Sequence, residues 1–168
     1  MSVLAQDAPE GSLPDVEVVR AADGWPEGAE TIVERAARAA LAQFEDASAM
    51  GAVSVALMDD AAIRILNRDY RGKDAATNVL SFPLENDLEM LPPGEQPPLG
   101  DIAVALETVT REAADEDKTL ADHLAHMIVH GTLHLLGYDH EQDGEAEEME
   151  ALERDVLASL GIADPYRI

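Results

Sequence analysis

The five histidines of the chain all lie between His123 and His140, and three of them have the spacing of metal ligands. His130 and His134 are four residues apart, so on a helix both imidazoles share one face, about 6 Å apart along the axis. Gly137 allows the chain to turn back sharply, which brings His140 to the same point from the far side. Three neutral imidazoles leave one position of a tetrahedral ion open, as in catalytic zinc sites. We therefore expect His130, His134 and His140 to hold one zinc ion.

The two remaining histidines have a different expected role. His126 and His123 lie on roughly the same stripe as His130, one and two turns earlier. For both we expect packing or hydrogen bonding rather than metal binding. The identity of the ion is inferred only, because three imidazoles also accept nickel, cobalt or copper.

The histidine spacing matches the H-E-x-x-H-x-x-G-x-x-H pattern of metzincin proteases, with one departure. Position 131 is Gly, where those proteases carry the Glu that takes a proton from the metal-bound water. Without this general base, peptide hydrolysis is disfavoured. A phosphodiester is a better candidate substrate, because the metal itself can supply hydroxide and neutralise charge. A metalloprotease remains the alternative.

Basic residues gather in one segment of an otherwise acidic chain. Eleven Lys and Arg stand against 35 Asp and Glu, for a formal net charge of −24, which repels polyanions at long range. Any polyanion must therefore be held by a local patch or by a metal. Four of the 11 basic residues lie within ten positions, at Arg64, Arg68, Arg71 and Lys73. The pattern alone also fits ordinary exposed ion pairs with Asp69 and Asp74.

Length and composition limit the class of protein. With 168 residues, of which 46% are hydrophobic, we expect a flexible tail over residues 1–14 and one globular domain over residues 15–168. The absence of Cys excludes disulfides and thiolate metal sites. The longest stretch without Asp, Glu, Lys or Arg, His123 to Tyr138, is shorter than the ~18 residues of a membrane span. No secretory segment is visible either, so we expect a soluble, cytoplasmic protein.

The periodicity of apolar residues predicts an α+β fold in which helices pack a small mixed sheet of about four strands. Short apolar runs predict strands at 15–20, 52–58, 79–82 and 101–106. Helical spacing predicts helices at 27–44, from Asp59 onward, at 107–114, from Thr119 to about Leu136, and at 146–160. The order of the strands cannot be predicted from these patterns.

The helices have expected starts, ends and buried faces. Asp59 and Thr119 are expected N-caps, and Gly137 is expected to end the histidine-bearing helix. The inward face of the helix after Asp59 is expected to carry Ile63, Leu66 and Tyr70.

One stretch and three shorter ones resemble a known family. The stretch 130–140, His-Gly-Thr-Leu-His-Leu-Leu-Gly-Tyr-Asp-His, resembles the signature of the YbeY family of metal-dependent endoribonucleases, the rRNA maturation factors. Segments 66–74, 77–83 and 99–102 resemble further segments of the same family, in the same order. Together the four stretches are highly specific, and the resemblance extends roughly from residue 53 to residue 161.

The resemblance implies a fold, a cofactor and an activity. It implies an α+β domain with a zincin-like metal-binding helix, zinc on His130, His134 and His140, and a functionally important arginine at Arg71. It further implies single-strand-specific cleavage of RNA, 3′-end maturation of small-subunit (16S) rRNA and ribosome quality control. RNA and the ribosome are then the expected partners, with one zinc ion per chain and no nucleotide cofactor. Ala76 departs from the family, in which proline is common before the threonine.

Within that reading, Arg71 is expected to stabilise the extra negative charge of a phosphodiester transition state. Asp101 and Asp139 are candidates for orienting a ligand imidazole, with a turn residue as the other interpretation of Asp139. Thr77 and Ser81 either contact substrate or complete a strand edge.

Acidic residues at the end of the chain predict how RNA approaches. Most of the carboxylates in 141–155 are expected to form a solvated helix face that repels RNA. We therefore expect approach from the side of residues 68–73 and low affinity for free RNA. A non-enzymatic ribosome assembly factor, with zinc that only holds the fold, is the second alternative.

Overall fold

The computed structural model describes residues 15–44, 51–83, 99–138 and 143–166, and the expected tail of residues 1–14 lies outside them. Four strands and five helices form in the described residues, which confirms the predicted α+β class. In chain order they are β1 (Val16–Arg20), α1 (Ala29–Leu41), β2 (Val53–Met58), α2 (Asp60–Arg71), β3 (Val79–Pro83), β4 (Gly100–Ala105), α3 (Leu106–Asp115), α4 (Leu120–Leu135) and α5 (Asp143–Ser159). Each lies within a few residues of its predicted bounds, except that for α2 only the start was predicted.

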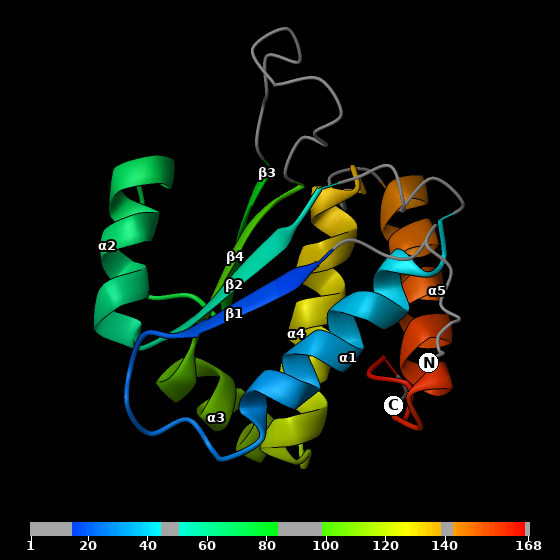
Figure 1. Ribbon diagram of the computed structural model, residues 1–168, viewed down its shortest axis with the longest axis horizontal. Helices are drawn as coiled ribbons and strands as arrows, with labels where there is room; N and C mark the ends of the chain where they lie inside the picture. Colours follow the sequence, from blue (N-terminus) through cyan, green and yellow to red (C-terminus); the bar gives the residue numbers. More distant parts are fainter. Residues whose placement is uncertain (1–14, 45–50, 84–98, 139–142, 167–168) are drawn as a thin grey trace, which may run out of the picture.

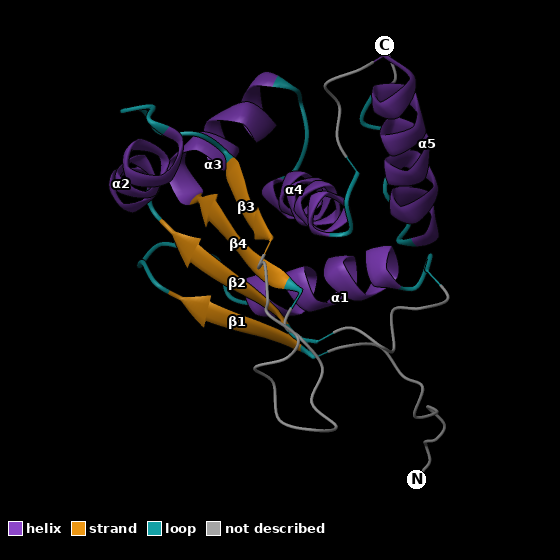
Figure 2. Ribbon diagram, turned by 90° about the horizontal axis from the view of Figure 1, so that it is seen from above, coloured by secondary structure: helices purple, strands orange, loops and turns teal. Residues whose placement is uncertain are grey.

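The strands form one mixed sheet in the order β1-β2-β4-β3. β1, β2 and β4 are parallel, whereas β3 runs antiparallel to β4 and forms one edge. Helices α1, α4 and α5 lie on one side of the sheet, and α2 lies on the other (Figure 1, Figure 2). This layering places α4 directly behind the β3 edge of the sheet.

Helix α4 is the centre of the core. It packs against α1, the sheet, α3 and α5, and its apolar side chains Leu124, Ile128 and Leu133 are fully buried. A helix that is apolar on most of its surface is stable only when other elements surround it. The polar residues on α4 are therefore placed by the packing of the whole domain.

Thr119 caps the start of α4, and a turn at Gly137 follows its end, as predicted. The hydroxyl of Thr119 accepts a hydrogen bond from the backbone N–H of Asp122 at 3.0 Å, which satisfies a donor that the helix leaves unpaired. At the other end Gly137 has a φ of 102°, a conformation that residues with a side chain rarely adopt. The chain thus turns directly after the histidine pair.

The predicted inward face of α2 is wrong at one residue. Tyr70 is 72% exposed, and the buried residues of α2 are Ile63 and Asn67. Asn67 takes the inward position of the last turns because its side-chain amide donates to the carbonyl of Ala75 at 2.9 Å. Tyr70 lies instead at the rim, with its ring 5.5 Å from that of Phe82.

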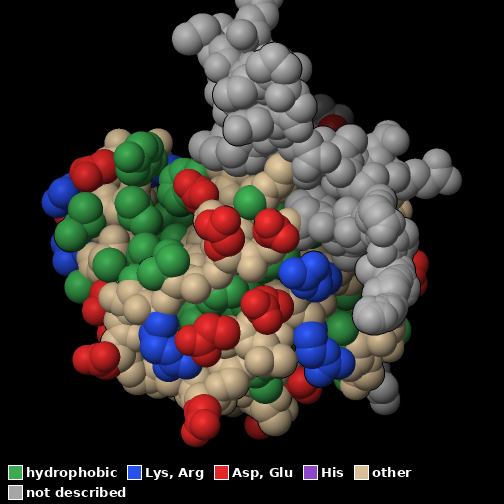
Figure 3. Space-filling model, viewed as in Figure 1, with side chains coloured by type: hydrophobic (Ala, Val, Ile, Leu, Met, Phe, Trp, Pro, Cys, Tyr) green, Lys and Arg blue, Asp and Glu red, His purple; other side chains and the backbone are tan. Residues whose placement is uncertain are grey.

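Part of the sheet face beside α2 remains uncovered. Apolar side chains gather on the surface around α2 (Figure 3), and Leu66, Val19 and Met58 line a cleft of about 390 Å³ between α2 and the strands.

Among the described residues, no helix combines the length and the apolar character that a membrane span requires.

Candidate metal centre and active-site cleft

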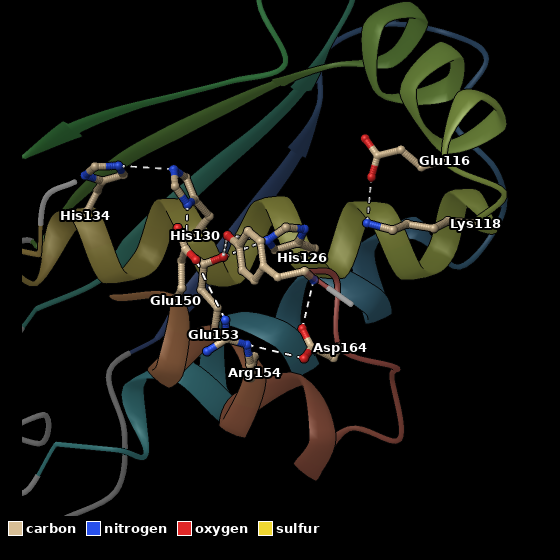
Figure 4. A network of polar contacts seen from close by, with 10 residues as sticks. Glu116, Lys118, His126, His130, His134, Glu150, Glu153, Arg154 and Asp164 are labelled. Atoms are coloured by element: carbon tan, nitrogen blue, oxygen red, sulfur yellow. Dashed lines mark hydrogen bonds and ion pairs between the residues drawn. The ribbon is translucent and has the colours of Figure 1, made fainter. Parts of the chain in front are cut away.

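His130 and His134 lie one turn apart on α4, with their side chains facing each other (Figure 4). The two Nε2 atoms are 3.1 Å apart, and the rings are nearly perpendicular at 80°. Two nitrogens on one tetrahedral zinc, each at about 2.0–2.1 Å, are separated by about 3.3–3.4 Å. The pair therefore already has nearly the separation that a shared ion requires.

The third predicted ligand, His140, lies outside the described residues, as does Asp139. Among the residues that are described, no three His, Cys, Asp or Glu side chains form a group that could hold a metal ion. After α4 the chain turns at Gly137. The ring centroid of the next residue, Tyr138, lies 5.7 Å from that of Phe44. Ligation by His140 stays a prediction.

A buried carboxylate from α5 contacts two histidines of α4. Glu153 has no exposed surface, and its Oε2 accepts a hydrogen bond from Nδ1 of His130 at 2.9 Å. Its Oε1 accepts from Nε2 of His126 at 2.7 Å and from the hydroxyl of Tyr166 at 2.5 Å. Burial alone raises the pKa of Glu153, but the hydrogen bonds from His126 and His130 lower it to about 2. The group is thus an ionised acceptor at neutral pH.

Glu153 is the site residue that sequence reasoning missed. The carboxylates at 145, 147, 148 and 155 are exposed, as expected for most acids of this segment, but Glu153 is an exception. It lies four residues after the buried Met149 and three before the buried Val156, so it shares their apolar stripe. An acidic residue within an apolar helix stripe was the sequence signal that could have identified Glu153 as a buried residue.

Asp101 does not have the role expected of it. Along β4, Ile102 and Val104 point into the core beneath α4, whereas Asp101 and Ala103 point to the opposite face. Asp101 there borders the cleft beside α2 and cannot orient a histidine of α4. The carboxylate that contacts His130 is Glu153 instead.

His123 and His126 are buried and hydrogen-bonded, as expected. Nε2 of His123 lies 2.8 Å from Oε1 of Glu112, which also accepts from the side-chain amide of Asn78 at 3.1 Å. Nε2 of His126 is hydrogen-bonded to Glu153. The Nε2 atoms of both histidines are thus engaged by carboxylates and do not face His130 and His134.

The histidine pair opens into a cleft of about 880 Å³. Arg71, at the end of α2, lines this cleft together with His130, His134, Ser81 and Tyr138. Arg71 is far from the histidines in sequence, and the β3 edge of the sheet brings both to one cavity. The fold therefore brings Arg71 and two of the three predicted metal ligands, His130 and His134, to one cleft.

The other arginines of α2 are paired at the surface. Nε of Arg64 lies 2.7 Å from Asp74, and Nε of Arg68 lies 3.0 Å from Asp69. The hydrogen bond from Arg64 lowers the pKa of Asp74. Ordinary exposed ion pairs thus account for these two arginines, whereas Arg71 makes no ion pair with any described carboxylate.

Gly131 brings α4 close to the sheet. A Cβ at this position would lie 3.1 Å from Oγ of Ser81 and 3.2 Å from the side chain of Ile102. The hydroxyl of Ser81 also donates to the carbonyl of Gly131 at 3.2 Å, so Ser81 both joins β3 to α4 and lines the cleft. A side chain at 131 would therefore press against Ser81 and Ile102, and glycine avoids this contact.

The model of the Endoribonuclease YbeY family matches residues 21–161 of this chain. The chain belongs to the endoribonuclease YbeY family. An endoribonuclease cuts RNA, so this membership makes RNA the polymer on which the protein acts. The match includes Arg71, the histidines of α4 and Glu153, and it stops before Tyr166.

Curated YbeY endoribonucleases are similar over most of the chain. The protein of Azorhizobium caulinodans is 57% identical over 159 residues, which cover 92% of this chain and 97% of the relative. The protein of Nitrobacter winogradskyi is 51% identical, with 92% and 83% covered. A solution structure from Thermotoga maritima is 25% identical, with a TM-score of 0.54, and covers 91% of this chain and 99% of its own.

Proposed function

We propose that this YbeY-family endoribonuclease cleaves single-stranded RNA at a zinc ion held by His130, His134 and His140. The observation that supports this most is the 3.1 Å separation of Nε2 atoms of His130 and His134, in a cleft that Arg71 also lines. Imidazole donors suit zinc, and three of them leave a position open for substrate or water.

A bound zinc ion supplies an activated water and neutralises phosphate charge. The chain's own groups then orient the RNA and stabilise the reacting phosphate. The guanidinium of Arg71 offers a planar fork of donors that matches two phosphate oxygens. Its place in the cleft suits it to stabilise the additional negative charge of the transition state.

We infer that RNA enters from the side of residues 68–73. Exposed carboxylates of α5 repel a polyanion, whereas the end of α2 and the turn after it carry Arg68, Arg71 and Lys73. With a net charge of −24, affinity for free RNA is expected to be low. The ribosome then supplies the positioning, and the 3′ end of small-subunit rRNA in the cytoplasm is the proposed substrate.

Substrate choice tests the proposal against the metalloprotease alternative. The zinc-loaded protein is incubated with single-stranded RNA, duplex RNA and an unfolded protein. Cleavage of the single-stranded RNA alone is the expected result. Cleavage of the unfolded protein, with the RNA left intact, contradicts the proposal.

A His140→Ala variant tests the assembly-factor alternative. Expected are a native circular dichroism spectrum, retained binding to the small ribosomal subunit and loss of RNA cleavage. Wild-type cleavage by a folded His140→Ala protein contradicts a ligand role for His140.

A further inference from the structure

Glu153 carries a charge in the interior of the protein, and the proposed reaction does not account for it. An ionised carboxylate is costly to bury unless hydrogen bonds and opposite charges compensate. Glu153 receives three hydrogen bonds, two from histidines of α4 and one from Tyr166 near the end of the described chain. This concentration of donors on one carboxylate points to a specific task.

We propose that Glu153 is a positioning residue that fixes the tautomer and the orientation of His130, and that Tyr166 holds Glu153 in place for this. The inference rests on the proposed metal site, because it assigns the reason why His130 is ready to bind an ion. The juxtaposition is visible in Figure 4, where Glu153 lies between α5 and the histidines of α4.

The tautomer follows from the chemistry of the contact. A carboxylate has acceptor oxygens only, so Nδ1 of His130 must carry the proton in the 2.9 Å hydrogen bond to Oε2. In the neutral ring the lone pair is then on Nε2, the atom that faces His134 at 3.1 Å. Carboxylates that accept from the outer nitrogen of a metal-binding histidine fix its ring in this way.

The same carboxylate selects the opposite tautomer in His126. Its Oε1 is 2.7 Å from Nε2 of His126, so that nitrogen carries the proton and cannot bind a metal. The Nδ1 of His126 is buried and has no hydrogen-bond partner among the described residues. One carboxylate thus prepares His130 as a ligand and keeps His126 out of the site.

The end of the chain fixes the rotation of the carboxylate. The hydroxyl of Tyr166 donates to Oε1, whereas Nδ1 of His130 donates to Oε2. Tyr166 is held in turn by Arg154, whose guanidinium lies 5.4 Å from its ring, and by Asp164, which accepts from its backbone N–H at 2.8 Å. Arg154 and Asp164 are themselves 3.3 Å apart. The segment 164–166 therefore closes over the outer side of Glu153.

Nuclear magnetic resonance of the metal-free protein tests the tautomers directly. Long-range ¹H–¹⁵N spectra of the histidine rings are expected to show His130 protonated on Nδ1 and His126 protonated on Nε2. In Glu153→Gln both rings are expected to shift toward a mixture of tautomers. A purely structural ion pair between α4 and α5 does not require opposite tautomers in the two histidines.

Zinc affinity, measured by competition with a chromophoric chelator, gives a second readout. Glu153→Gln is expected to weaken zinc binding about 10- to 100-fold, as loss of such an outer partner commonly does. Tyr166→Phe is expected to weaken it about 2- to 10-fold, the equivalent of one hydrogen bond. Glu148→Gln is the matched control, because Glu148 lies on the same helix and its side chain is exposed. It should bind zinc as the wild type does.

The inference is overturned if a folded Glu153→Gln protein keeps both tautomers and the wild-type zinc affinity. It is equally overturned if wild-type His130 is protonated on Nε2. Should Glu153→Gln fail to fold, the wild-type spectrum and the Tyr166→Phe affinity decide. A wild-type protein that binds no zinc contradicts the proposed function, whereas the ring tautomers in the metal-free protein decide the role of Glu153 separately.

Discussion

At the scale of single residues, the role of a side chain follows from what it can reach. Arg71 lines the cleft of the histidine pair, whereas Arg64 borders a separate small cavity and is paired with Asp74. Both are exposed arginines on α2, so a comparison of the two tests the effect of position while the residue type stays the same.

Substitution of these two arginines is predicted to have unequal effects. Arg71→Ala should reduce RNA cleavage at least ~100-fold, the usual cost of removing one electrostatic group from a transition state. Zinc content should be unchanged, because Arg71 is not a metal ligand. Arg64→Ala should cut within a few-fold of the wild-type rate, about the value of an exposed ion pair. Single-turnover cleavage measures both, and wild-type cleavage by a zinc-loaded Arg71→Ala protein removes the proposed role.

Two glycines on helices are predicted to respond to alanine with opposite signs. At Gly131 a Cβ meets Ser81 and Ile102 at 3.1–3.2 Å, so Gly131→Ala should destabilise the fold by about 1–3 kcal/mol through overpacking. The helix propensity of alanine offsets at most about 1 kcal/mol of that cost. At Gly144 a Cβ meets nothing within 4 Å, so Gly144→Ala should stabilise. Urea unfolding measures both free energies, and a stabilised Gly131→Ala protein contradicts the packing described.

At the scale of elements, cap residues could be predicted because they act over three or four positions. Asp59 accepts from the backbone of Ala62 at 2.8 Å, as the sequence predicts, and the same is true of Thr119 on α4. The strand order β1-β2-β4-β3 could not be predicted, because it depends on pairing between segments far apart in the chain. The exposure of Tyr70 depends likewise on Asn67 and the turn that follows α2.

The cap of α4 is predicted to contribute to stability without taking part in the reaction. Thr119→Ala should lower the free energy of unfolding by about 1 kcal/mol, because the N–H of Asp122 loses its acceptor. Thr119→Ser keeps a hydroxyl and should remain close to the wild type. Cleavage by the folded, zinc-loaded protein should be unchanged in both. Equal unfolding free energies for alanine and serine at this position would falsify the capping role.

The site itself was only partly predictable for a related reason. His130 and His134 stand out because histidine is rare in this chain and their spacing is local, whereas Arg71 stands out only through the resemblance to the YbeY family. Glu153 is one of eight acids in 141–155, and among them its place in the apolar stripe of α5 was the signal for burial. Its contact with His130 depends on the way α5 packs on α4, which sequence periodicity does not specify.

At the scale of the whole molecule, the net negative charge of the protein disfavours binding of RNA, which is itself a polyanion. With a net charge of −24, the protein repels RNA, and carboxylates are prominent on the face shown in Figure 3. Such long-range effects are screened beyond about 8 Å at physiological salt. We therefore expect added salt to change the affinity for RNA more than it changes the rate of the cleavage step.

Neutralising exposed acids of α5 is predicted to raise the affinity for free RNA. The triple variant Glu145→Gln, Glu147→Gln, Glu148→Gln removes three exposed carboxylates without touching the cleft residues named above. Fluorescence anisotropy should show a larger gain at low salt than at physiological salt, where screening is stronger. An unchanged or lower affinity at low salt would show that these acids do not repel RNA.

Zinc titration shows whether metal held by the histidines of α4 drives RNA cleavage. The protein is stripped with a chelator, zinc is returned in measured amounts, and the initial rate of single-stranded RNA cleavage is followed. We expect no cleavage without metal and a rate that rises until about one zinc per chain is bound, then levels off. Full cleavage by protein that analysis shows to be free of metal would contradict this expectation.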